Sequence, residues 1–579
     1  MGLQYGICNL DNAPLDPEVL AHANLLLAAY GPEKTTTYTD RHAAILHRAF
    51  STTAESRREV NPRQLAHGAL MTWDGRLDNR EELLSELKGD LAPEADDAAI
   101  AASAYMRWRE ECFAKLVGDW ILSVWDPNIR LLVLAKDSIG TRPLYYTIKR
   151  NQVVWSTLLD AVVDDADKPL KLDEEYIAGW LASFPGDHLT PYEMIHAVPA
   201  SALVRFENGR CKTFRYWNFD SVKTITYTRD TEYEEHFRDV FTRSVERRLR
   251  SDHPVLAELS GGVDSSSIVC VADNILSRGP AGTARLDTVS YFNESEPNWD
   301  ERPYFTKVEE KRGRAGYHID LTAEGYFPFA AQHEHFPVSP RSSASASEGA
   351  KRLASHMCSG GHRVLLSGIG GDELTGGVPT PVPELGDLFV KGEIRILARQ
   401  LKAWALNKRK PWFQLASETG RHFLPFPWAR VKEHQRPAAW LDHRFVERQE
   451  RALLGYEDRW RLFGPRPSFE ENLSTLDALR RQITCNPIPC RPYYEKRYPY
   501  LDRDLVTFLF AVPRSQLLRP GHRRSLMRRA LSGIVPPEIL DRKRKAFVVR
   551  SPIDVVASAW PTIFGSDRAT FAGALAFCK

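Results

Sequence analysis

The residues best suited to chemistry lie in a short turn at residues 259–266, with the sequence LSGGVDSS. The apolar run at residues 255–259 predicts a buried parallel strand, and the apolar spacing of residues 265–276 predicts a helix. Glycines let the backbone approach an anion closely, and the start of a helix offers free N–H groups to phosphate. The expected phosphate-binding residues are therefore Leu259, Ser260, Gly261, Gly262, Asp264, Ser265 and Ser266.

A second turn of the same construction, SGIGGDEL, occurs at residues 367–374 after another apolar run. Ligands bind at the carboxyl ends of neighbouring strands in a doubly wound sheet, so Ser367 and Gly368 are expected to bind the same nucleotide as the first turn. Mg²⁺ prefers one or two carboxylates together with phosphate oxygens, which makes Asp264 and Asp372 the expected metal ligands. The two turns indicate an enzyme that splits ATP into AMP and pyrophosphate. No GxxxxGK[ST] sequence occurs, which argues against a Walker-type kinase or ATPase.

The two turns resemble the pyrophosphate loop and the second acidic loop of the asparagine synthetase superfamily. Residues 495–502 (EKRYPYLD), 535–539 (VPPEI) and 542–547 (RKRKAF) are similar to further segments of that family. The resemblance implies that Lys545, or Lys543 if the register differs by two, faces the adenylate and the tetrahedral intermediate.

The resemblance covers nearly the whole chain and implies an α/β fold with two domains. Residues 1–210 would form a degenerate Ntn-glutaminase-like αββα sandwich, in which two antiparallel sheets lie between helices. Residues 211–579 would form a PP-loop ATP pyrophosphatase-type doubly wound parallel sheet that carries the ligase activity. Residues 375–480 are expected to be a helical insert in this second domain.

The expected first domain lacks the catalytic element of its relatives. Family glutaminases begin Met-Cys-Gly-Ile, and removal of the methionine frees a cysteine whose own amine activates its thiol. The matching stretch here is residues 5–7, so Tyr5 stands in the nucleophile position, while Cys8 would become N-terminal only after proteolytic trimming. The family's Asn-Gly-Glu, which grips glutamine, reads Asp74-Gly75-Arg76. We therefore expect no glutamine hydrolysis and a domain that persists as a structural partner.

Position 369 separates branches of the family. Asparagine synthetases that use glutamine usually carry an acidic residue there, and β-lactam synthetases usually carry a tyrosine; here it is Ile369, which cannot accept a proton. Any general base must come from elsewhere, and Glu495 is a candidate from its place in the family motif. A peptide α-amino group has a pKa of about 7.7–8.0, so part of it is already free at neutral pH and a dedicated base is less necessary.

This profile, together with residues 73–80 (WDGRLDNR) and 376–384 (GGVPTPVPE), resembles the lasso-peptide cyclases. These enzymes join the N-terminal amine of a core peptide to an internal Asp or Glu side chain as a macrolactam. The resemblance implies ATP and Mg²⁺ as cofactors, a peptide with a free N-terminal amine and an Asp or Glu side chain as substrate, and a leader peptidase as a candidate partner. An asparagine synthetase-like enzyme that uses ammonia, or an inactive scaffold in a biosynthetic complex, are the alternatives.

Length and composition exclude several classes of protein. A chain of 579 residues is too long for one core. The 77 Lys and Arg residues nearly balance the 75 acidic ones, so no overall charge favours nucleic acid. Neither an 18-residue apolar run nor a secretory signal is found. We expect a cytoplasmic protein with no membrane span and no nucleic-acid partner.

Overall fold

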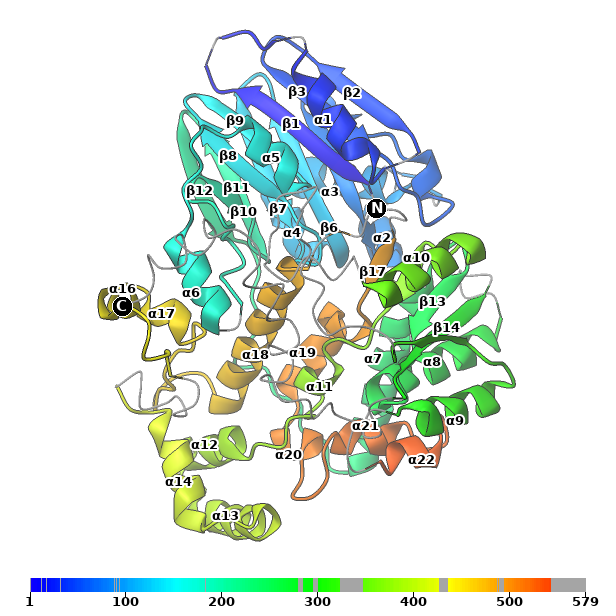
Figure 1. Ribbon diagram of the computed structural model, residues 1–579, viewed down its shortest axis with the longest axis vertical. Helices are drawn as coiled ribbons and strands as arrows, with labels where there is room; N and C mark the ends of the chain where they lie inside the picture. The colour runs from blue at the N-terminus through cyan, green and yellow to red at the C-terminus, as the bar shows by residue number, and fades with distance from the viewer. Residues whose placement is uncertain are drawn as a thin grey trace.

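The computed structural model shows two domains joined over a broad face (Figure 1). It describes residues 2–542 other than 12, 17, 32, 88, 90, 93, 183, 280–284, 295–299, 323–346, 426–435, 487 and 489–493. The N-terminal domain, blue to cyan, lies above the C-terminal domain in Figure 1. No helix in the described part of the chain is both long and apolar enough to cross a bilayer.

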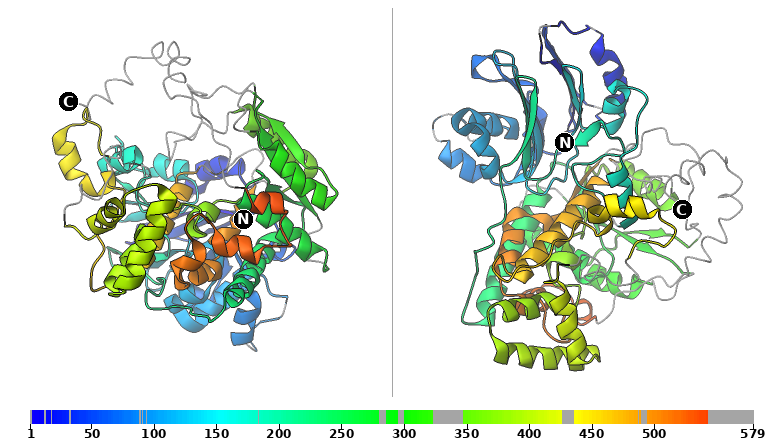
Figure 2. Two further views of the ribbon diagram at one scale, coloured as in Figure 1. Left: turned by 90° about the horizontal axis from the view of Figure 1, so that it is seen from below. Right: turned by 90° about the vertical axis from the view of Figure 1, so that its left-hand side faces the viewer.

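Two six-stranded antiparallel sheets form the centre of the N-terminal domain, in the orders β10-β8-β9-β1-β3-β2 and β12-β11-β7-β6-β5-β4. Figure 2 shows the two sheets stacked edge-on with helices outside them, which confirms the expected αββα sandwich. The strands are β1 (Leu3–Asn9), β2 (Thr35–Thr39), β3 (Ala43–Arg48), β4 (Arg63–Gln64), β5 (Leu70–Leu77), β6 (Gly118–Asp126), β7 (Leu131–Lys136), β8 (Tyr145–Lys149), β9 (Gln152–Ser156), β10 (Ile195–Ala197), β11 (Ala202–Glu207) and β12 (Arg210–Arg215).

The alternation of side chains along β1 separates two apolar layers, because successive residues of a strand point to opposite faces. Leu3, Tyr5 and Ile7 pack beneath the outer helices, whereas Cys8 joins the core between the sheets. The helices of this domain are α1 (Val19–Ala28), α2 (Arg80–Glu86), α3 (Asp97–Trp108), α4 (Cys112–Lys115), α5 (Leu159–Asp165) and α6 (Glu174–Ala182).

The last strand of this domain runs past the predicted boundary at residue 210. Strand β12 pairs with β11 from Ala202↔Arg215 to Glu207↔Arg210. A cut at residue 210 would remove β12 from its sheet. The first domain therefore extends to at least Arg215, because the turn at Asn208 and Gly209 is a hairpin within the domain and not a linker.

The C-terminal domain is built on a five-stranded parallel sheet in the order β15-β14-β13-β16-β17. Its strands are β13 (Val255–Glu258), β14 (Leu286–Phe292), β15 (Tyr317–Asp320), β16 (Val364–Leu366) and β17 (Glu495–Arg497). The chain first adds strands to one side of β13 and then to the other, so the order reverses between β13 and β16. This is the switch point at which open α/β sheets bind ligands.

Helices cover both faces of the parallel sheet, as a doubly wound fold requires. On one face Val255 and Ala257 pack with residues of α8, while on the other Leu256 packs with Leu353 and Met357 of α10. The helices of this part are α7 (Asp230–Leu249), α8 (Val263–Leu276), α9 (Arg302–Arg312), α10 (Glu348–Gly360), α11 (Gly371–Leu374), α19 (Arg503–Ala511), α20 (Arg514–Leu517), α21 (Ser525–Ala530) and α22 (Pro537–Leu540).

The segment between β16 and β17 is helical in its described parts, in agreement with the expected insert. Helices α13 and α14 form the lower end of the molecule in Figure 1, and α18 returns the chain toward the sheet. The insert comprises α12 (Val382–Val390), α13 (Ile394–Lys408), α14 (Trp412–Arg421), α16 (His443–Arg448), α17 (Glu450–Leu453) and α18 (Pro467–Thr484).

Buried ion pairs join the two domains at their interface. Arg76 on β5 lies 3.1 Å from Glu495 of β17, and it also lies 2.8 Å from both Asp78 and Asp119. Both Arg76 and Glu495 are only 3% exposed. Removing one partner of a buried pair leaves the other charge uncompensated, which is strongly destabilising.

The same network of ion pairs continues from Glu495 to two further arginines. Glu495 lies 2.9 Å from Arg497 and 3.4 Å from Arg142, and Arg142 in turn donates to Asp74 at 2.6 Å. Burial alone would raise the pKa of Glu495, but the charges of Arg497 and Arg142 outweigh it and hold the pKa well below its usual range. Glu495 is therefore a permanent anion at the centre of the interface.

We expect Arg76→Ala to lower the free energy of unfolding by about 3–5 kcal/mol, because Glu495, Asp78 and Asp119 would stay buried without their shared cation. Arg205→Ala is the matched control, since Arg205 also pairs with carboxylates but is 34% exposed; it should cost about 0.2–1 kcal/mol. Urea-unfolding midpoints followed by tryptophan fluorescence compare the two variants. Equal shifts would contradict the proposed importance of the interface network.

Candidate nucleotide-binding and ligase site

The two predicted loops leave neighbouring parallel strands at the same edge of the sheet. Strands β13 and β16 pair in register, with Ala257 opposite Leu366. The first loop follows β13 and leads into α8, and the second follows β16 and leads into α11. The structure thus brings Asp264 and Asp372 together at the switch point, although the sequence separates them by more than a hundred residues.

The first loop owes its shape to Gly261. This residue has φ of +65°, and a Cβ there would lie 2.6 Å from Cβ of Tyr304 and 2.8 Å from the amide of Phe305. The helix α9 therefore approaches the loop so closely that only glycine fits. Leu259 anchors the start of the loop, because its N–H donates to the carbonyl of Val289 at 2.8 Å.

Ser260 and Ser265 face each other across the first loop. The N–H of Ser260 donates to Oγ of Ser265 at 3.1 Å, and the two hydroxyl oxygens lie 3.0 Å apart. Ser266 is fully buried, and its N–H already bonds to Gly262, so its hydroxyl is not presented at the loop surface as the sequence suggested. The first helical N–H groups, from residue 263 to 265, precede any helical partner and are the donors suited to an anion.

The second loop is packed tightly against the first. Gly370 has φ of +92°, and a Cβ on Gly371 would lie 2.6 Å from Cβ of Asp264. Gly368 lies against the start of α8, since a Cβ on it would come within 3.4 Å of the Ser265 amide nitrogen. Ser367 is buried and donates its N–H to the carbonyl of Arg497. Ser367 therefore holds the loop to β17, and Gly368 provides the contact with the first loop.

One cation bridges the two acidic side chains. The guanidinium of Arg524 donates from Nε to Oδ1 of Asp264 at 2.9 Å and from Nη2 to Oδ2 at 2.7 Å. The same Nη2 also bonds to Oδ1 of Asp372. A single positive group thus reaches both carboxylates, which shows that the pair is placed to share a cation. This fits the expectation that Asp264 and Asp372 hold one Mg²⁺.

Two further residues fix the loops and were not anticipated from the sequence. The hydroxyl of Tyr500 donates to the carbonyl of Asp264 at 3.1 Å. Arg542 donates to the carbonyl of Gly261 at 3.0 Å and pairs with Glu301 at 2.6 Å. Among the 77 Lys and Arg residues, nothing local marks Arg524 as special.

The basic segment that includes Lys543 and Lys545 lies outside the described residues, so its predicted role stays a prediction. Its neighbour Arg542, the last described residue, contacts the first loop at Gly261.

The expectation that Glu495 acts as a general base is wrong on geometric and electrostatic grounds. Glu495 pairs with Val364, the first residue of β16, whereas the loops leave the other ends of these parallel strands. It is also buried among arginines that keep it ionised. A carboxylate held in this way accepts no proton from a substrate at the loop edge, and its role is to join the domains.

The structure also corrects the position of Tyr5. Its side chain is buried beneath α1 and α5, and its hydroxyl donates to Asp165 at 2.8 Å. Gly2, not Tyr5, lies next to the remnant of the glutamine-gripping motif, where its N–H donates to Asp74 at 2.7 Å. Matching Tyr5-Gly6-Ile7 to the family's Cys-Gly-Ile therefore aligned the wrong residue with the nucleophile position. Neither Gly2 nor Tyr5 supplies a nucleophilic thiol.

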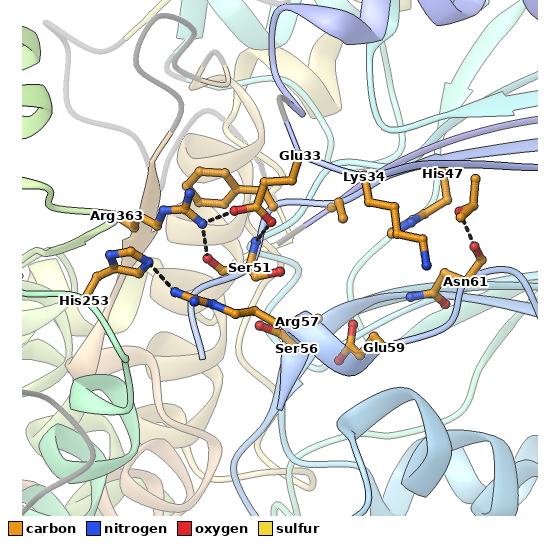
Figure 3. Close-up of a pocket in the computed structure, with 15 residues that line it drawn as sticks. Glu33, Lys34, His47, Ser51, Ser56, Arg57, Glu59, Asn61, His253 and Arg363 are labelled. Atoms are coloured by element: carbon orange, nitrogen blue, oxygen red, sulfur yellow. Dashed lines mark hydrogen bonds and ion pairs between the residues drawn. The ribbon is translucent and has the colours of Figure 1, made fainter. Parts of the chain in front are cut away.

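A cavity of about 310 Å³ lies beside Gly2 and Gly75. Figure 3 shows Lys34, Asn61 and Glu59 around it, with Arg363 of the second domain closing one end through its pair with Glu33. The described residues that line the cavity include no cysteine. Among these described residues the cavity thus shows no thiol of the kind that glutamine hydrolysis needs.

Fold and site together define an ATP pyrophosphatase-type ligase fused to an amidotransferase-like domain. Residues 236–559 match the family model "Asparagine synthase", and residues 5–217 match "Glutamine amidotransferase domain". The chain belongs to the asparagine synthase family. It is an ATP-dependent carbon–nitrogen ligase that forms AMP.

Two curated relatives come from Bacillus subtilis (strain 168). "Asparagine synthetase [glutamine-hydrolyzing] 3" is 25% identical over 82% of this chain and 74% of its own length. "Asparagine synthetase [glutamine-hydrolyzing] 1" is 24% identical over 92% of this chain and 84% of its own length. Identity this low supports the family and the fold, and it leaves the substrates open.

We expect Gly261→Ala to weaken ATP binding by about tenfold or more, equivalent to about 1.4 kcal/mol. The added Cβ would collide with Tyr304 and Phe305 and displace the loop. Gly361→Ala is the control, because Gly361 has almost the same φ, +66°, with no atom within 4 Å of the added Cβ. Both variants should lose about 1–2 kcal/mol of stability from the left-handed backbone, but isothermal titration with ATP should show weaker binding only for Gly261→Ala. Equal ATP affinity in both would contradict the assignment of this loop.

Proposed function

We propose that this ligase closes a macrolactam in a lasso-type precursor peptide. The observation that carries the proposal is the contrast between the two domains. The acidic loops of the ligase domain meet around one cation, whereas the described residues that line the cavity of the amidotransferase-like domain include no cysteine. Without ammonia released from glutamine, the nitrogen nucleophile would arrive on the peptide substrate itself.

Arg76 supports this reading of the first domain. In relatives that use glutamine the corresponding position is a glutamate, whose charge suits the α-ammonium of glutamine. Here the arginine is buried in ion pairs with Asp78, Asp119 and Glu495. The residue has changed from a ligand contact to a link between domains, so the domain is retained for structure.

In the proposed reaction, ATP and the peptide meet at the loop edge. Asp264 and Asp372 would hold Mg²⁺, which offsets the charge of the leaving pyrophosphate when bound. The free N–H groups at the start of α8 and the hydroxyl of Ser260 would bind phosphate oxygens. Lys543 or Lys545 would face the adenylate formed on an Asp or Glu side chain of the peptide.

The amine would attack the adenylate without a strong general base from the protein. Ile369 offers no proton acceptor and packs against the core of the domain. A peptide α-amino group has a pKa of about 7.7–8.0, so a usable fraction is unprotonated near neutral pH. Because a leader must be removed to expose this amine, a leader peptidase is the proposed partner, and the reaction would take place in the cytoplasm.

The direct test combines purified enzyme, ATP, Mg²⁺ and a candidate core peptide. We expect the peptide to lose one water while one AMP is released per ring. Asp264→Asn and Asp372→Asn should each reduce AMP release by at least about a hundredfold, as loss of a group that stabilises the transition state does. Asp320→Asn is the control, since Asp320 is an exposed carboxylate at the end of β15, and it should keep full activity.

Three results would contradict the proposal. Formation of ADP would exclude adenylation of the carboxylate. AMP release that does not depend on the peptide, with asparagine made from aspartate and ammonium, would favour an ammonia-using asparagine synthetase. Unchanged activity in the two Asn variants would remove the acidic loops from the reaction.

A further inference from the structure

The guanidinium of Arg524 occupies the position between Asp264 and Asp372 that the reaction assigns to a metal ion. Three of its hydrogen bonds end on these two carboxylates. The side chain of Arg524 is 7% exposed and that of Asp264 is 12% exposed, so this is a shielded ion pair. Asp372 is more open, with 45% of its side chain exposed.

The arginine and a divalent cation would compete for the same oxygen atoms. Both carboxylate oxygens of Asp264 accept from Arg524, and Oδ1 of Asp372 accepts from it as well. Mg²⁺ binds oxygen at about 2.0–2.1 Å with strict geometry, so a Mg²⁺ on these oxygens would lie within a few ångströms of the guanidinium and meet a like charge in a shielded site. One cation has to leave before the other binds.

Moving the guanidinium of Arg524 away from these carboxylates costs free energy, because a shielded charge loses its partners, unless another anion binds it. Its described acidic partners are Asp264 and Asp372. The backbone of Arg524 is held by a bond from its N–H to the carbonyl of Gly376 at 3.1 Å, so the side chain would move while the backbone stays. ATP phosphates bound at the adjacent loop are anions of the kind that a guanidinium binds well.

We propose that Arg524 is an internal counter-ion that blocks the metal site until ATP arrives. The inference rests on the proposed metal site. Free Mg²⁺ would bind weakly because it has to displace a buried guanidinium that gains no new partner. Mg²⁺ together with ATP would bind well, because the phosphates receive the displaced side chain. Metal and nucleotide binding are thereby coupled, and the two carboxylates always have a cation between them.

The test measures Mn²⁺ binding by electron paramagnetic resonance in the full-length enzyme, with and without ATP. In the wild type, ATP should increase Mn²⁺ affinity by at least about tenfold, within the usual range of coupling between sites. Without ATP, Arg524→Met should bind Mn²⁺ at least about tenfold more tightly than the wild type. Adding ATP should then increase the Mn²⁺ affinity of this variant much less than it does in the wild type. Arg523→Met, a change at the adjacent arginine, should behave as the wild type does.

Thermal unfolding provides a second readout that does not depend on activity. Arg524→Met in EDTA leaves two carboxylates without their cation, so its melting temperature should fall and then recover on addition of Mg²⁺. The wild type should respond little to Mg²⁺ alone. Arg524→Lys keeps the charge with fewer directed donors, so its Mn²⁺ affinity should lie between those of the wild type and Arg524→Met. It also provides a folded variant if Arg524→Met unfolds.

Equal Mn²⁺ affinity of the wild type, Arg524→Met and Arg524→Lys without ATP would overturn the inference. So would tight Mn²⁺ binding by the wild type alone. If Mn²⁺ binding with ATP is lost in Asp264→Asn, but Arg524→Met binds Mn²⁺ as the wild type does, the proposed metal site stands and only the role of Arg524 fails. If Mn²⁺ does not bind even with ATP, both the metal site and the inference fail.

Discussion

The buried contact between Arg76 and Glu495 constrains the arrangement of the whole molecule. It joins β5 of the first domain to β17 of the second at a separation of 3.1 Å, within a network that continues to Arg497, Arg142 and Asp74. Charges this deep in a protein are tolerated only when each has its partners. Separating the domains would leave several buried charges without partners, so the first domain is held in place although the described residues that line its cavity include no cysteine.

That constraint reaches the ligase site through one strand. Glu495 begins β17, Arg497 ends it and accepts from Ser367 of the second loop, and Tyr500 follows to hold Asp264. The interface therefore lies at one end of β17 and the loops at the other. The strand that carries the interface anion also carries the residues that fix both acidic loops.

Local patterns predicted much of this structure. The two strand-to-helix loops were predictable, because apolar periodicity and glycine-rich turns act over a few residues. The parallel neighbours β13 and β16 followed from the likeness of the two loops. The helical character of the insert followed from its resemblance to the family.

Contacts between distant residues were not predictable. Arg524 lies 260 positions from Asp264, and Arg76 lies 419 positions from Glu495, and no pattern in one chain pairs them. Glu495 was assigned as a base because its motif is familiar, whereas its position at the start of β17 gives it a structural role. Tyr5 was misplaced because a three-residue match ignored which face of β1 each side chain occupies.

The central claim is that the nitrogen of the new amide comes from the peptide and not from glutamine or ammonia. The most direct measurement supplies ¹⁵N-amide glutamine and ¹⁵N-ammonium together with an unlabelled core peptide, ATP and Mg²⁺, and follows the product by mass spectrometry. A ligase whose first domain is only structural gives a dehydrated peptide free of ¹⁵N. Incorporation of ¹⁵N into the product would contradict the claim.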